Sequence, residues 1–295
     1  MSPTRPSSST APSRADVPAT FTRGDTRSVL ARFLPSDAGV QPGKWRWAVA
    51  SKATGKSCAP PAQPPCEDRA PDEGVRSITV RTPRLKGCTP KGRSYRLHGT
   101  RARKQIALTF DDGPSPYTSS MLGVLDRLGA KATFFVVGQQ IAGRHAMLRR
   151  ILSNGHEVAN HSWNHAMLAG GGGGANGQIR RTNAVVRSVT GFTPCLFRAP
   201  YGAVGGSLVG DARRAGLATI QWDVDPRDWS TPGAAAIYAR VVGLARGGSI
   251  VVMHDGGGPR GQTVQAVVSI IKTLRARGYE FVTVSQMLGS KQVYR

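Results

Sequence analysis

Two aspartates near the middle of the sequence could bind a cation or move a proton. Asp111 and Asp112 come directly after the short apolar run at residues 105–110. Adjacent carboxylates beside a buried strand are costly unless they are paired or bind a metal ion. Residues 111–114, Asp-Asp-Gly-Pro, also fit a simple turn, since all three residue types favour turns. The pair alone therefore indicates either a turn or a cation site.

Two histidines further along, His161 and His165, are separated by three residues. On a helical turn this spacing places both imidazoles on one face, where they could bind one metal ion. Without another ligand, a surface pair is the commoner outcome of such spacing. With a carboxylate from a neighbouring strand end, the three side chains predict a metal site that leaves a position open for water or substrate.

A second group of residues could transfer protons. Arg198 either caps a carbonyl or pairs on the surface, but if it is buried near Asp111 it would keep that carboxylate ionised. Asp228 and His254 are either separate structural groups or a pair. As a pair, the carboxylate would favour the protonated imidazole and fix its orientation, so that His254 would serve as a general acid.

The elements that must position these residues alternate between strands and helices from about residue 104. Strands are expected over 105–110, 132–137, 156–160, 196–198, 217–224, 249–253 and 281–284. Helices are expected over 118–128, 146–154, 178–190, 207–215, 234–245 and 263–277, with a flexible glycine loop at 170–174. This alternation predicts an α/β fold of about seven parallel strands, in a small or incomplete (β/α) barrel. Active sites of barrels lie at the C-terminal strand ends, where the residues named above fall.

Five motifs, in order, resemble those of the polysaccharide deacetylase family, the NodB-homology or fourth family of carbohydrate esterases. The motifs are TFDDGP at 109–114, HSWNH at 161–165, RAPYG at 198–202, DPRDW at 225–229 and VMH at 252–254. No single motif is decisive, but five in order within residues 100–290 are specific. The resemblance implies a distorted (β/α) barrel that hydrolyses acetyl groups from N-acetylated or O-acetylated sugars.

The resemblance also implies a role for each reacting residue. Asp111 would be the general base, tethered by Arg198, and His254 the general acid, held by Asp228. A divalent metal, usually zinc but with Co²⁺ or another ion as alternatives, would be bound by three side chains: Asp112, His161 and His165. The base would take a proton from a metal-activated water, and the acid would protonate the leaving amine.

A substrate site is implied as well. The backbone N–H of Tyr201 would stabilise the oxyanion, Trp229 would form a wall and Val252 would line the acetyl pocket. Trp229 and Val252 are equally explained as core residues. Two positions depart from the family pattern, since Ala199 stands where proline is usual and Val252 where leucine is usual. Neither departure removes a reacting group, so activity is expected.

The composition favours an anionic partner. The net charge is +23, from 40 basic and 17 acidic residues, and such a chain attracts polyanions. The expected partner is a carbohydrate polymer, namely anionic cell wall, with N-acetylglucosamine of peptidoglycan as first substrate, chitin oligomers second and acetylated xylan as an alternative. No apolar run is long enough to span a membrane. A monomer without a specific nucleic-acid partner is expected.

Three other functions stay open. The first is a glycoside hydrolase that uses Asp225 and Asp228 as acid and base, although such pairs usually come from different strands. The second is a polyanion or nucleic-acid binding protein without catalysis, although the basic residues lack interleaved aromatic ones. The third is a metal-free relative acting on cyclic amides, against which the intact His161 and His165 argue.

Residues 1–98 form a basic region rich in Pro and Ser. This composition cannot bury enough apolar surface to offset chain entropy, so the region is expected to be mostly disordered or loosely ordered. A short strand at 75–80 is the exception. The catalytic domain is then expected over residues 99–290, followed by a tail at 291–295.

The cysteines bear on location. There are four of them and no CxxC pair, which excludes a zinc-thiolate finger and mildly favours an exported protein. An extracellular or cell-wall location is therefore expected, although no apolar signal segment is visible. Pairing of Cys88 with Cys195, and of Cys58 with Cys66, is one of three connectivities.

Overall fold

The computed structural model describes two compact units, Met1–Pro83 and Arg84–Arg295. The backbone is described in the strands between residues 20 and 80, at 85–90 and at 94–294, and side chains at 86–90 and 94–290. The strands that are described in the first unit form three antiparallel pairs. These are β1 (Thr20–Asp25) with β2 (Ser28–Arg32), β3 (Gly43–Trp47) with β6 (Arg76–Val80), and β4 (Val49–Ala53) with β5 (Cys66–Ala70). The strand expected at 75–80 coincides with β6, and the disorder expected elsewhere in this region stays a prediction.

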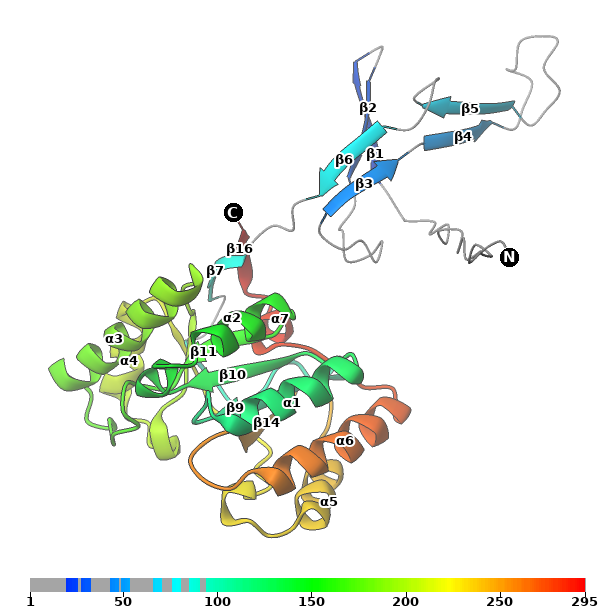
Figure 1. Ribbon diagram of the computed structural model, residues 1–295. Coiled ribbons are helices and arrows are strands. Elements are labelled where there is room, and N and C mark those ends of the chain that lie inside the picture. Colours follow the sequence, from blue (N-terminus) through cyan, green and yellow to red (C-terminus); the bar gives the residue numbers. More distant parts are fainter. Residues whose placement is uncertain are drawn as a thin grey trace, which may run out of the picture. The chain divides into compact units, whose positions relative to one another are not determined.

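A parallel sheet of eight strands forms the centre of the second unit (Figure 1). Its order is β14-β9-β10-β11-β12-β13-β8, and β15 also pairs with β9. The strands are β8 (Tyr95–Arg96), β9 (Gln105–Asp111), β10 (Ala132–Val136), β11 (Glu157–Asn160), β12 (Leu196–Phe197), β13 (Ala218–Ile220), β14 (Ser249–His254) and β15 (Glu280–Phe281). Bridges from His98 to Ser249 and from Val224 to Val251 join the two edges. The sheet therefore closes into the distorted (β/α) barrel that the sequence predicts.

Amphipathic helices pack around this barrel (Figure 1). They are α1 (Pro116–Arg127), α2 (His145–Ser153), α3 (Gly173–Thr190), α4 (Gly206–Arg214), α5 (Ala234–Leu244), α6 (Gly261–Ala276) and α7 (Val284–Leu288). The apolar faces of α1 and α6 meet strand residues in one core, where Leu125, Ile270 and Phe110 are completely buried. Burial of each such side chain stabilises the fold by roughly 1.5–3 kcal/mol. This packing holds the strand ends, and hence the residues on them, in fixed positions.

Two elements differ from the sequence-based expectation. Helix α3 begins at Gly173, inside the glycine stretch expected to be a flexible loop. Strand β15 has only two residues, and Val284–Leu288 is helical because Thr283 caps it by accepting a hydrogen bond from the backbone N–H of Gln286. The capping side chains satisfy N–H groups that a strand would have paired with a neighbour.

The barrel unit extends beyond the limits expected from sequence. Strand β7 (Leu85–Thr89) pairs antiparallel with β16 (Lys291–Tyr294), and β8 joins the barrel. Cys88 and Cys195 form a disulfide, so that pairing is confirmed, whereas Cys58 lies outside the described residues. The compact unit therefore starts at Arg84 rather than near residue 99. No helix in the described part of this chain is long and apolar enough to cross a membrane.

Candidate active site

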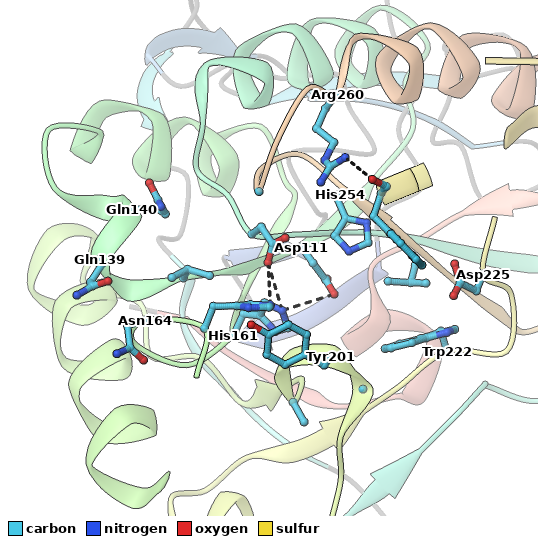
Figure 2. A pocket seen from close by; sticks show the side chains of 18 residues that line it. Asp111, Gln139, Gln140, His161, Asn164, Tyr201, Trp222, Asp225, His254 and Arg260 are labelled. Atoms are coloured by element: carbon cyan, nitrogen blue, oxygen red, sulfur yellow. Dashed lines mark hydrogen bonds and ion pairs between the residues drawn. The ribbon is translucent and has the colours of Figure 1, made fainter. Parts of the chain in front are cut away.

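A pocket of about 770 Å³ lies at the C-terminal ends of the barrel strands (Figure 2). Eight of the ten residues predicted for the deacetylase site line it: Asp111, Asp112, His161, His165, Tyr201, Trp229, Val252 and His254. Two more, Arg198 and Asp228, are buried behind it and bonded to Asp111 and His254 respectively. The ten predicted residues are therefore brought together around one pocket.

The strand register places the expected base and acid side by side. Asp111 ends β9 and pairs with His254, the last residue of the neighbouring β14. The apolar residues before each of them are buried in the barrel, so both side chains emerge where the apolar pattern stops. The sequence alternation of strand and helix thus accounts for the closeness of these two residues.

Three side chains converge on one small volume. Nε2 of His165 lies 3.2 Å from Oδ1 of Asp112, and Nε2 of His161 lies 3.5 Å from the same oxygen. The three candidate ligand atoms are within 4.8 Å of one another. Oδ1 of Asp112 is buried and accepts no hydrogen bond within the described part of the chain. A buried, unpartnered carboxylate oxygen facing two imidazole nitrogens fits a divalent cation.

His161 is held in the form that binds metals. Its Nδ1–H donates to the carbonyl oxygen of Arg198 at 2.9 Å, an assignment made from the hydrogen-bond network, which leaves the Nε2 lone pair directed at Asp112. Burial lowers the pKa of His161 to about 3, with the charge of Asp112 only partly opposing it. The ring is therefore neutral over the whole physiological range, and a neutral imidazole is a metal ligand.

The loop that carries both histidines is irregular, so the expectation of a helical turn at 161–165 is wrong. Ser162 and His165 have positive φ angles of 68° and 60°. Side chains hold the loop in place of helical hydrogen bonds: Asn160 accepts from the backbone of Ser162 at 2.9 Å, and Gln178 on α3 accepts from Trp163 at 2.9 Å. The imidazoles still converge, with ring centroids 5.0 Å apart.

Arg198 is a completely buried cation that positions Asp111. Its Nη1 donates to Oδ1 of Asp111 and to Oγ1 of Thr109, both at 2.7 Å, while its other nitrogens donate to the carbonyls of Ile220 and Gln221. Burial raises the pKa of Asp111 above its usual value, and the charge of Arg198 opposes this shift without cancelling it. Arg198 alone therefore does not keep the carboxylate as readily ionised as expected. A cation at the neighbouring Asp112 would lower this pKa further.

The pKa of His254 is shifted in the opposite direction from that of His161. Its Nδ1–H donates to Oδ1 of Asp228 at 2.7 Å, and Oδ2 of Asp228 accepts from the backbone of His254 and from Thr263. Burial lowers the pKa of His254, but the hydrogen bond and charge of Asp228 outweigh it, so the pKa is raised above its usual value. His254 can therefore hold a proton on Nε2 and deliver it to a group in the pocket.

The remaining predicted residues form the walls. Tyr201 has a positive φ of 60° in a short turn at Pro200–Gly202 and packs against His165 at 4.5 Å between ring centroids. Trp229 is about half exposed and Val252 is buried at the pocket floor. Asp228 faces His254 rather than the pocket, which leaves Asp225 without a second carboxylate on its own loop for glycoside hydrolysis.

Five further polar or aromatic side chains that the sequence analysis did not single out line the pocket: Gln139, Gln140, Asn164, Trp222 and Arg260. Figure 2 shows the three amides on one side of the catalytic residues, Trp222 with Asp225 on the other, and Arg260 reaching in beside His254. Trp222 and the glutamines follow β13 and β10 by a few residues, so the strand-end rule could have found them. Arg260 does not closely follow a strand, so the strand-end rule does not point to it.

Comparisons with known proteins agree with this geometry. The sequence model of the polysaccharide deacetylase family matches residues 98–220. A peptidoglycan-N-acetylglucosamine deacetylase of Bacillus cereus is 38% identical over 196 residues, which cover 64% of this chain and 90% of that protein. A chitooligosaccharide deacetylase of Bradyrhizobium is 37% identical over 205 residues, covering 65% of this chain and 92% of the relative.

Solved structures show the same fold. The crystal structure of the Bc1960 peptidoglycan N-acetylglucosamine deacetylase aligns with a TM-score of 0.64 and 32% identity, covering 66% of this chain and 92% of that one. A pseudoenzyme of the same esterase family from Bacillus anthracis aligns with a TM-score of 0.62 and 26% identity, covering 66% and 68%. Because the similarity spans nearly the whole of two curated relatives, the chain belongs to the polysaccharide deacetylase family of carbon–nitrogen hydrolases.

Proposed function

We propose that this protein is a metal-dependent hydrolase that removes acetyl groups from N-acetylglucosamine residues of peptidoglycan. The observation that carries the proposal is the arrangement around Asp111. A cluster of three candidate metal ligands lies on one side of this carboxylate and a histidine with a raised pKa on the other, all in one pocket. Because one structural relative with the same fold is a pseudoenzyme, the fold alone does not argue for activity. The argument for activity is this arrangement of side chains.

The donor set favours Zn²⁺, with Co²⁺ or another divalent ion as alternatives. Asp112, His161 and His165 would hold the ion through one carboxylate oxygen and two Nε2 atoms. When bound there, a divalent ion makes a water more acidic and polarises the acetyl carbonyl. The hydrogen bond from His161 to the Arg198 carbonyl would fix the ligand's tautomer, as partners of metal ligands generally do.

Asp111 and His254 would each carry out one of the two proton transfers. Oδ2 of Asp111, which lies 3.9 Å from Nε2 of His161, would accept the proton of the attacking water while Arg198 holds Oδ1. The oxygen of that water forms a bond to the acetyl carbon, and the negative carbonyl oxygen would accept a hydrogen bond from the backbone of Tyr201. His254 would give its Nε2 proton to the nitrogen as the C–N bond breaks. The products are acetate and a free amine on the sugar.

The choice of polymer rests on two observations. The Bacillus cereus relative is named for peptidoglycan N-acetylglucosamine, and the net charge of +23 suits an anionic wall. Chitin oligomers come second because of the Bradyrhizobium relative, and an acetyl xylan esterase, with an alkoxide as leaving group, is the alternative. A cell-wall or extracellular location follows from this substrate and fits the Cys88–Cys195 disulfide.

The test is acetate release from peptidoglycan, chitin oligomers and acetylated xylan, measured after chelation and again after zinc is added back. The proposal expects release from peptidoglycan that stops with the chelator and returns with zinc. Release only from xylan would favour the esterase. Absence of acetate from all three with zinc bound, together with tight and salt-sensitive binding of nucleic acid, would favour the non-catalytic polyanion binder.

A further inference from the structure

Arg260 is a buried cation that opens into the catalytic pocket. It lies one residue before α6 and only 4% of it is exposed. Its Nε donates to the carbonyl of Gly256 at 2.7 Å, and its Nη1 contacts the carbonyls of Pro259 at 3.3 Å and Trp229 at 3.5 Å. Nη2 donates to none of the residues that the structure describes. Figure 2 shows the side chain reaching into the pocket beside His254.

The comparison with Arg198 shows what Arg260 lacks. Both arginines are buried beside the same pocket, but Arg198 forms an ion pair with Asp111 at 2.7 Å. No carboxylate of the described residues forms an ion pair with Arg260. Burying a charge without a counter-charge is energetically unfavourable, so such charges are normally paired. The unpaired guanidinium facing the pocket therefore fits an anionic group that the substrate brings.

We propose that Arg260 is a specificity-determining residue that binds a carboxylate on the sugar next to the acetylated one. This inference rests on the proposed function, since that reaction places a glycan chain across the pocket. Three backbone carbonyls already hold the guanidinium, so little side-chain freedom is lost when the anion binds. In peptidoglycan the matching group is the lactyl carboxylate of a muramic acid without its peptide, and chitin has no such group.

The position of Arg260 also says where the anion lies. Its contact with the carbonyl of Trp229 places it on the Asp228–His254 side, away from His161 and His165. Two acidic groups of the loop that contains Trp229 are already engaged: Asp228 by His254 and Thr263, and Asp225, whose Oδ1 accepts from the backbone of Arg227. The carboxylate would therefore bind beside the leaving amine.

The test uses two probes that differ at one group, which is charged in the first and neutral in the second. One is the disaccharide N-acetylglucosaminyl-N-acetylmuramic acid, and the other is the same disaccharide with its lactyl carboxylate converted to the methylamide. Binding to the zinc-loaded full chain is followed by tryptophan fluorescence, because Trp222 and Trp229 line the pocket, and is read in stopped flow before turnover. We expect the carboxylate to bind about tenfold more tightly or better, as charged hydrogen bonds typically allow.

Variants separate recognition from loop support. Arg260→Gln is expected to bring the carboxylate-to-amide ratio close to one, and Arg260→Lys to keep part of it. The matched control is Arg240→Gln, because Arg240 also donates to a carbonyl of the Trp229 loop, at Pro226, but does not line the pocket. This control is expected to keep the wild-type ratio.

Two outcomes overturn the inference: equal binding of both probes by the wild type, or a ratio that survives Arg260→Gln. If Arg260→Gln fails to fold, the inference is tested on the wild type alone. It then requires tighter binding of the carboxylate probe and loss of that preference at high salt. Acetate release is measured in parallel. Acetate release without a charge preference would rule out the anion site and leave the proposed function standing. A charge preference without acetate release would rule out the proposed function and leave the anion site standing.

Discussion

His161 and His254 lie on opposite sides of one pocket, and their surroundings shift their pKa values in opposite directions. His161 is buried and His254 is partly buried, and both donate from Nδ1 to an oxygen: His161 to the neutral carbonyl of Arg198, His254 to the carboxylate of Asp228. At His161 the effect of burial dominates and lowers the pKa to about 3. At His254 burial also lowers the pKa, but the interaction with Asp228 opposes it and the pKa is raised. The charge of the acceptor therefore accounts for the opposite pKa shifts, which suit the roles of metal ligand and acid proposed for the two residues.

The largest effect is expected from removing the carboxylate on the metal side. Asp112→Ala takes away the only anionic ligand of the predicted set, so zinc content should fall and acetate release should drop by about 10³-fold or more. Metal analysis and an acetate assay check this. Asp126→Ala, which removes an exposed aspartate on α1, serves as the control. Full zinc content in Asp112→Ala would contradict the metal site.

Removing the acid should leave the metal side intact. His254→Ala is expected to keep zinc and to lower kcat by about 10²–10⁴-fold, because a positioned proton donor typically contributes that much. The measurement is kcat together with zinc content, with the exposed His145 replaced by alanine as control. A near-normal rate in His254→Ala would remove this residue from the reaction.

The pH profile sharpens the comparison between the two histidines. His254 must carry its proton to act as an acid, so activity is lost as the pH rises through its raised pKa. Asp228→Asn removes the charge that raises this pKa, so the alkaline limb of kcat should move to lower pH, with a rate loss of about tenfold or more. Asp225→Asn alters a pocket carboxylate on the same loop that does not touch His254, and should leave the limb in place. An unmoved limb in Asp228→Asn would argue against the pair.

The smallest effect on activity is expected at the opposite end of the barrel. Cys195 directly precedes β12, so its disulfide with Cys88 lies away from the pocket, and it links residues 107 positions apart. Replacing both cysteines by alanine should lower the free energy of unfolding by up to about 4–5 kcal/mol, by the chain-entropy estimate, while kcat changes little. Urea unfolding and acetate release are measured on the same samples. A large loss of kcat in the folded variant would show that the two ends of the barrel are coupled.

The site could be predicted from the sequence because its residues follow buried strands. The apolar run before Asp111 and the one ending at His254 mark strand ends, and parallel strands bring such ends together. The pairing of β9 with β14 confirms that these two strand ends lie side by side. The role of each residue, which the motif resemblance implies, stays a prediction.

Other features depend on tertiary contacts that no local pattern displays. The loop at 161–165 takes its shape from hydrogen bonds to the side chains of Asn160 and of Gln178 on α3. The spacing of the two histidines, which predicts a helical turn, does not reveal these contacts. The burial of Arg260 depends on carbonyls of two separate loops, which sequence periodicity does not reveal. The two-residue strand β8 is recognised only by its pairing with β13.

The central claim is that one histidine binds the metal while the other moves the proton. The most direct measurement is zinc content and acetate release, from the same preparations, of His161→Gln and His254→Gln beside the wild type. The account predicts that His161→Gln loses both zinc and activity, and that His254→Gln retains zinc and loses activity. Equal zinc content in the two variants with equal rates, or a near-normal rate in either, would contradict it.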